Sequence, residues 1–251
     1  MHIELDPQLL EGVVFQEIRR REQLGDQAVF RDYRDRVDAL YDLPEDEDRE
    51  IAFRDVHADF FGRLGMEQTV RNHLDEFPLL HQKLDRINFL KALTRKDEGA
   101  ELFVRQDDGV DDGQHRVAVL RLRAEAFLDT QGFTMLMRRE LYHVSDMVDP
   151  AFGYEPDLGD TGDDAAQKNL VRDRYRILWS LYIDSRLVCD GRALAAILQQ
   201  GRGLLEKAFG CFGDQQASAV FEKVSNAKSL THANLLALAK NCAPTLATSI
   251  G

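Results

Sequence analysis

The sequence predicts an α+β protein that is mostly helical, with a small, largely antiparallel sheet packed on one helix and flanked by N- and C-terminal helices. Two patterns lead to this fold class. Apolar residues recur at helical spacing from about residue 7 to 94 and again after residue 130. Between these regions, over about residues 100–127, apolar and polar residues alternate with the period of two that half-buried strands show.

Residues 1–95 are predicted to form a helical N-terminal region of about four or five helices. In "QLLEGVVFQEIRRRE", the apolar residues lie near one helical face: Leu9, Leu10, Val13, Val14 and Ile18. "AVFRDYRDRVDALYDL" repeats this pattern, and Pro44 with the acidic residues after it ends that helix and begins the next. "LLHQKLDRINFLKAL" is assigned to the last helix of the region.

Residues 96–251 are predicted to form the core and a helical C-terminal cap. "AELFVRQ" and "HRVAVLRLRAEAF" are expected to pair as a hairpin, with "DDGVDDG" as its turn. A helix over about 130–148 follows, ended by Pro150. After a loop rich in Gly, Pro and Asp come a long amphipathic helix, "QKNLVRDRYRILWSLYIDSRLV", and three further helices between residues 191 and 241. No flexible linker separates the two regions, so we expect one compact unit.

The acidic composition restricts the possible partners. Lys and Arg number 32 against 44 Asp and Glu, and the net charge of −12 argues against nucleic acid and against an anionic membrane as the main partner. No apolar run approaches the ~20 residues of a membrane span, and the N-terminus lacks the pattern of a signal peptide. The three cysteines suggest no disulfide framework. We therefore expect a soluble, cytoplasmic protein.

The stretch "RRELYHVSD", at residues 138–146, differs by one letter from the zinc-binding motif H-E-x-x-H. Arg139 stands in place of the first His, and Glu140 and His143 stand in place of the general base and the second ligand. On a helix, Arg139, His143 and Asp146 share one stripe, because residues three and four apart lie on the same side. In the intact motif this spacing brings two imidazoles to one ion, while the Glu polarises a metal-bound water.

The segments "RRELYHVSDMVDPAFGYEP" and "RYRILWSLYIDSRL" resemble a zincin-like metallopeptidase, whose full motif would read HELxHVxDM. The resemblance covers about residues 117–190, where a strand, a short loop and the motif helix follow in the order seen in zincins. It implies a zincin-like core, peptide-bond hydrolysis and a zinc cofactor. It also implies an acidic third ligand on a second helix, for which Asp184 is the best match. The metzincin position for that ligand is Asp149, which we consider less suitable because Asp146 replaces the glycine of the metzincin turn.

Two further predictions concern side chains near this motif. Tyr154, in "AFGYEP", is a candidate oxyanion donor, as tyrosines or histidines are in some metallopeptidases; the alternative is a loop tyrosine that packs on the end of the helix. On the second helix, Trp179 and Tyr182 are expected in the core, and Arg186 in a surface or interhelical ion pair.

Arg139 is the serious departure from the motif. A guanidinium stays protonated and offers no lone pair, so Arg139 cannot ligate a cation, and it would repel a divalent ion held by His143, Asp184 and Asp146. The same charge can instead pair with the carboxylates and replace the metal electrostatically. We therefore expect a degenerate site, in which zinc binding and zinc-dependent peptide hydrolysis are weak or lost.

Two other functions are compatible with these residues. The chain can be an active metal-dependent hydrolase, with Glu140 activating a water while His143 and Asp184 hold the ion. It can also be a non-catalytic binding or regulatory protein, either a zincin relative whose former site Arg139 locks by ion pairing or a helical interaction module in which these residues do not converge. The expected substrate or partner is in each case a peptide or a protein.

Overall fold

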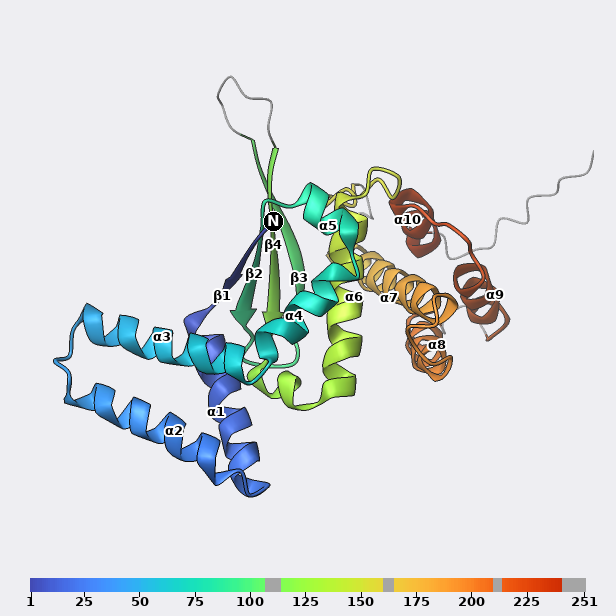
Figure 1. The fold of residues 1–251 in the computed structure, drawn as a ribbon. Helices are drawn as coiled ribbons and strands as arrows, with labels where there is room; N and C mark the ends of the chain where they lie inside the picture. The colour runs from blue at the N-terminus through green and yellow to red at the C-terminus, as the bar shows by residue number, and fades with distance from the viewer. Residues whose placement is uncertain (107–113, 160–164, 210–213, 241–251) are drawn as a thin grey trace, which may run out of the picture. The chain divides into compact units, whose positions relative to one another are not determined.

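The computed structural model of the protein describes residues 1–106, 114–159, 165–209 and 214–240 (Figure 1). The chain is mostly helical and contains one four-stranded sheet, so the predicted α+β class is confirmed. It divides into two compact units, Met1–Ser145 (unit 1) and Asp146–Gly251 (unit 2). Among the described residues, no helix combines the length and the apolar character needed to cross a membrane.

Unit 1 begins with a helical region close to the predicted one. Its helices are α1 (Pro7–Gln23), α2 (Gln27–Asp38), the short 3-10 helix η1 (Ala39–Asp42), α3 (Glu47–Arg63), α4 (Met66–Asp75) and α5 (Pro78–Lys83). The five apolar residues expected on the inner face of α1 are all buried. Asp6, Asp26 and Asp46 each accept a backbone N–H at the start of α1, α2 and α3, respectively, which satisfies donors that a helix start otherwise leaves unpaired.

The sheet of unit 1 is mixed. Its strands are β1 (His2–Leu5), β2 (Arg86–Lys91), β3 (Gly99–Gln106) and β4 (Gln114–Leu122), in the order β1-β2-β4-β3 (Figure 1). β1 pairs parallel with β2, and β2 pairs parallel with β4. β3 and β4 are antiparallel, as predicted for the hairpin. The predicted turn of that hairpin, at residues 107–113, lies outside the described residues.

The prediction of a largely antiparallel sheet is wrong, because it missed β1 and β2. The segment "RINFLK" was predicted to lie in the last helix of the N-terminal region, as part of "LLHQKLDRINFLKAL". The helix in fact ends at Lys83, and Ile87 and Phe89 are buried on one face of a six-residue strand. The expected region boundary at 95/96 falls inside unit 1, between two strands of this same sheet.

The predicted motif helix is α6 (Thr130–Val148), which follows β4 and the 3-10 helix η2 (Ala124–Leu128). One apolar stripe of α6 is buried: Phe133, Met137, Leu141, Val144 and Val148. In unit 1, Tyr142 packs edge-on against Phe77, with ring centroids 5.0 Å apart. Residues of α6 up to Ser145 belong to unit 1, and those from Asp146 onward belong to unit 2.

Unit 2 is built around the long helix α7 (Ala165–Cys189), against which α8 (Ala196–Phe209), α9 (Asp214–Ser225) and α10 (His232–Lys240) pack. These helices confirm the four that the sequence predicts after residue 165. Trp179 and Tyr182 are buried on α7, as expected. Arg174, only 2% exposed, donates from Nε to the carbonyl oxygen of Ala208 at 3.1 Å and lies over the Phe209 ring. Residues 160–164 of the predicted loop before α7 lie outside the described residues.

We predict that Ile87→Ala lowers the free energy of unfolding by about 2 to 5 kcal/mol, because Ile87 is fully buried in a strand with neighbours on both sides. The urea midpoint followed by circular dichroism measures this change. The control Lys91→Ala alters an exposed side chain of the same strand and should stay within about 0.5 kcal/mol of the parent protein. Equal effects of the two substitutions would contradict the central position of β2.

Candidate functional site

The residues of the degenerate motif lie on α6 within unit 1. Arg139, Glu140 and His143 are all half-buried, and the unbroken helix places Arg139 and His143 one turn apart. Glu140 lies near the start of the hairpin strand β3, since a Cβ built on Gly99 would be 4.0 Å from Glu140 Oε2. The motif helix therefore presents its predicted base next to an end of the sheet.

Arg138 precedes Arg139, the residue that stands in place of the first His of the motif. It forms an ion pair that was not predicted from the sequence. Its Nε donates to Glu76 Oε2 at 2.9 Å and its Nη2 donates to Glu76 Oε1 at 3.1 Å. Burial acts to raise the pKa of Glu76, but hydrogen bonds from Arg138 and His73 outweigh it and lower this pKa. Arg138 thus anchors α6 to the end of α4 by a charge-assisted fork.

Asp146, a predicted metal ligand, accepts hydrogen bonds on both carboxylate oxygens. Arg186 Nη1 donates to Oδ1 at 2.8 Å, and Arg186 Nη2 donates to Oδ2 at 2.6 Å. Trp179 Nε1 also donates to Oδ2, at 2.7 Å. Asp146 is 3% exposed, so this buried carboxylate has its charge balanced by a guanidinium within the protein. The interhelical ion pair expected for Arg186 is confirmed, and the arrangement favours a structural role for Asp146 over metal binding.

The remaining predicted ligands lie in different parts of the chain. Asp184 is buried near the C-terminal end of α7, in unit 2, whereas His143 belongs to unit 1, so their convergence stays a prediction. Asp149 accepts the backbone N–H of Ala151 at 2.9 Å and so shapes the turn that follows α6. Among the described residues, no group of three or more His, Cys, Asp and Glu side chains is arranged to hold a metal ion. With Arg139 unable to ligate, the residues present fit a three-ligand zinc site poorly.

Tyr154 packs in an aromatic cluster of unit 2. Its half-buried ring lies 5.5 Å from the Trp179 ring and 5.7 Å from the His232 ring, between centroids. Burial raises the pKa of its hydroxyl. This packing matches the alternative of a loop tyrosine, while a role as oxyanion donor stays a prediction, because Glu140 belongs to the other unit.

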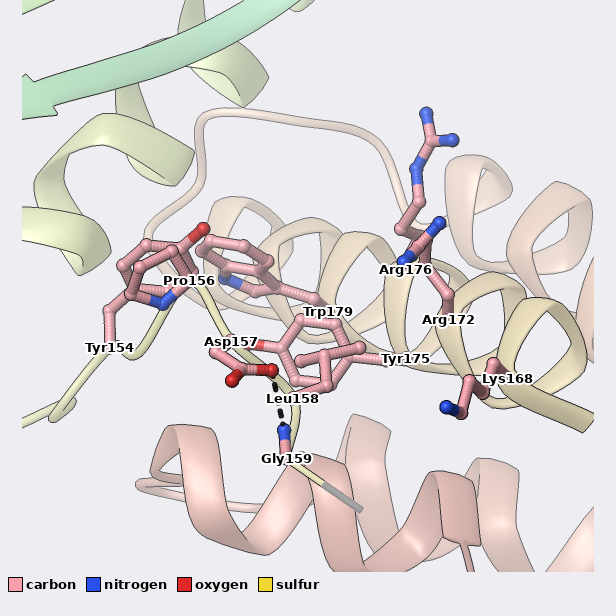
Figure 2. Close-up of a pocket in the computed structure, with 10 residues that line it drawn as sticks. All are labelled: Tyr154, Pro156, Asp157, Leu158, Gly159, Lys168, Arg172, Tyr175, Arg176 and Trp179. Carbon is pink, nitrogen blue, oxygen red and sulfur yellow. Dashed lines mark hydrogen bonds between the residues drawn. The ribbon is translucent and has the colours of Figure 1, made fainter. Parts of the chain in front are cut away.

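Unit 2 contains a pocket beside this cluster that was not predicted from the sequence (Figure 2). The pocket has a volume of about 380 Å³ and is lined by α7 and by the segment from Tyr154 to Gly159. Lys168, Arg172 and Arg176 line it from positions four residues apart on α7. That spacing is a signal in the sequence, because it puts three cationic side chains on one helical face.

Comparisons of the chain with known proteins give no match: no family model, no curated protein and no solved structure is similar to it. The site is therefore interpreted from its own residues. The zincin resemblance of residues 117–190 stays a prediction.

We predict that Asp146→Asn lowers the free energy of unfolding by about 2 to 3 kcal/mol, because it removes the buried negative charge to which Arg186 donates two hydrogen bonds. The matched control is Asp173→Asn, at an exposed position of α7, which should change stability by less than about 0.5 kcal/mol. Urea unfolding of both variants measures the difference. A stable Asp146→Asn protein that has lost bound metal would instead assign Asp146 to a metal site.

We predict that the stability of unit 2 falls as the pH decreases below about 6.5, the ordinary pKa of histidine. His232 is buried and its Nδ1 is 2.7 Å from the Tyr175 hydroxyl oxygen. Burial lowers the pKa of His232, so the unfolded chain takes up a proton before the folded one does, and this stabilisation is lost toward acidic pH. Urea midpoints at pH 7 and pH 5.5 measure it. His232→Gln should reduce the dependence, and the control His2→Gln, at an exposed residue, should keep it.

Proposed function

We propose that this chain is a zincin-like, metallopeptidase-related protein with a degenerate R-E-x-x-H site, in which zinc-dependent peptide hydrolysis is weak or lost, and that it acts mainly by binding a peptide or protein. The observation that carries the proposal is the fork of Arg186 on Asp146. A carboxylate that shares the helical stripe of the motif, and was predicted as a metal ligand, is here neutralised by an arginine of the protein itself.

Too few of the predicted zinc ligands remain available to form a catalytic zinc site. The four candidate positions on α6 and α7 are Arg139, His143, Asp146 and Asp184. The alternative after α6, Asp149, accepts the backbone N–H of Ala151. Arg139 cannot ligate, and Asp146 already accepts three hydrogen bonds. His143 and Asp184 are left, whereas catalytic zinc sites use three protein ligands and keep one position for water. A guanidinium on the same helical stripe as His143 further disfavours a divalent cation, because like charges repel strongly where water is partly excluded.

A peptide partner is supported by the strand next to the motif. In the part of unit 1 that the structure describes, β3 pairs only with β4 and so is an edge of the sheet. Phe103 and Val104 of β3 are exposed, at 52% and 51%, on opposite faces of the strand. An unpaired strand edge offers backbone N–H and C=O groups to an extended peptide, and exposed apolar side chains add contacts. Such a peptide would run toward Gly99 and therefore toward Glu140.

We predict that protein purified without chelators contains well under one zinc per chain, and that Arg139→His raises the zinc content. Restoring the imidazole supplies the first ligand of the motif and removes the repelling charge. Elemental analysis after incubation with zinc and desalting measures this, and hydrolysis of an unstructured protein substrate measures activity. The matched control is Arg138→His, one position earlier on the same helix, where Glu76 already holds the parent side chain and no metal should be gained.

Two outcomes would contradict the proposal. A parent protein that already carries stoichiometric zinc and cleaves the substrate would show an active metal-dependent hydrolase, with His143 and Asp184 as ligands. An Arg139→His variant that folds normally by circular dichroism and gains no more zinc than Arg138→His would remove the support for a former zinc site.

A further inference from the structure

We propose that the pocket of unit 2 binds a small aromatic phosphate, about the size of a nucleoside monophosphate. The pocket is formed where the segment Tyr154–Gly159 crosses one face of α7 (Figure 2). Its volume of about 380 Å³ lies within the range of ordinary small-molecule sites. The inference does not depend on the zinc motif, because all the described lining residues belong to unit 2.

One end of the pocket is aromatic. Figure 2 shows the rings of Tyr154 and Trp179 side by side at this end, with Tyr175 next along α7. The polar atoms of the two buried rings are already used: Trp179 Nε1 donates to Asp146, and the Tyr175 hydroxyl pairs with His232. Trp179 and Tyr175 therefore offer the pocket their ring faces and edges rather than hydrogen bonds. A flat apolar group, which needs no polar partner, suits this end best.

The other end of the pocket is cationic. Lys168, Arg172 and Arg176 line this end from positions four residues apart on α7, and Figure 2 shows their charged groups spread along the helix. All three are exposed, and none makes an ion pair with another described residue. The described lining contains one carboxylate, Asp157, which accepts the backbone N–H of Gly159 at 2.9 Å and so orders the turn.

These three cations, which have no ion pair among the described residues, differ from many other arginines of this acidic chain. Many other arginines pair with carboxylates, as Arg63 does with Asp32 at 2.6 Å and Arg86 with Glu4 at 2.8 Å. In a protein with a net charge of −12, a row of three cations facing one pocket attracts an anion. Two guanidinium groups one helical turn apart match the oxygens of a phosphate group, which arginine binds through paired hydrogen bonds.

The single tryptophan of the chain makes the proposal directly measurable. Trp179 is the only Trp, so intrinsic fluorescence reports on the aromatic end of the pocket. We predict that adenosine monophosphate and phenyl phosphate change this fluorescence saturably, and that inorganic phosphate or adenosine alone binds at least about tenfold more weakly. Binding should also weaken as the salt concentration rises, because the cations are exposed.

Substitutions distinguish binding in the pocket from non-specific electrostatic binding to the protein surface. Arg172→Ala combined with Arg176→Ala should weaken binding of adenosine monophosphate by about tenfold or more. The control Lys223→Ala removes one exposed cation of α9, outside the pocket lining, and should leave the affinity unchanged. Circular dichroism checks that both proteins are folded.

Three results would overturn the proposal. The first is the absence of a saturable change with any aromatic phosphate. The second is equal affinity for inorganic phosphate and adenosine monophosphate, which would show a simple anion site without ring recognition. The third is much tighter binding of a phosphotyrosine peptide than of phenyl phosphate, which would assign the pocket to a protein partner.

Discussion

The carboxylate of Asp146 holds the last turn of α6 against α7. Arg186 approaches it with two nitrogens and Trp179 with its indole N–H, and all three bonds are 2.8 Å or shorter. Because the carboxylate is buried, this pairing is strongly directional and leaves few alternative positions for the two α7 side chains. The orientation of the Trp179 ring, on which the neighbouring loop packs, depends on it.

That ring organises the segment that leads from α6 to α7. Phe152 stacks on Trp179 with centroids 5.4 Å apart, and its carbonyl oxygen accepts the backbone N–H of His232 at 2.8 Å. Tyr154 follows on the same cluster, and Tyr175 closes it through its hydrogen bond to His232. The aromatic end of the pocket is therefore a consequence of the ion pair beneath it, since the same indole takes part in both.

Arginine has two different uses in this molecule. Arg138 and Arg186 each satisfy a half-buried or buried carboxylate, Glu76 and Asp146, and so stabilise the packing of α6. The exposed cations on the pocket face of α7 have no such partner among the described residues. Two arginines next to or facing the motif helix thus serve its packing, one in each unit.

The sequence by itself determined the long helices and the β3–β4 hairpin, because their apolar periodicity is local. It also determined that position 139 cannot ligate a cation, since this is a property of the guanidinium group. Only the tertiary structure decided that β1 and β2 are strands: they pair with segments far away along the chain, His2 with Arg86 for example, and carry too few residues for a periodic signal. The tertiary structure also decided the role of Asp146. Its donors, Trp179 and Arg186, lie 33 and 40 residues further along the chain, and the sequence does not indicate which donor will contact a given carboxylate.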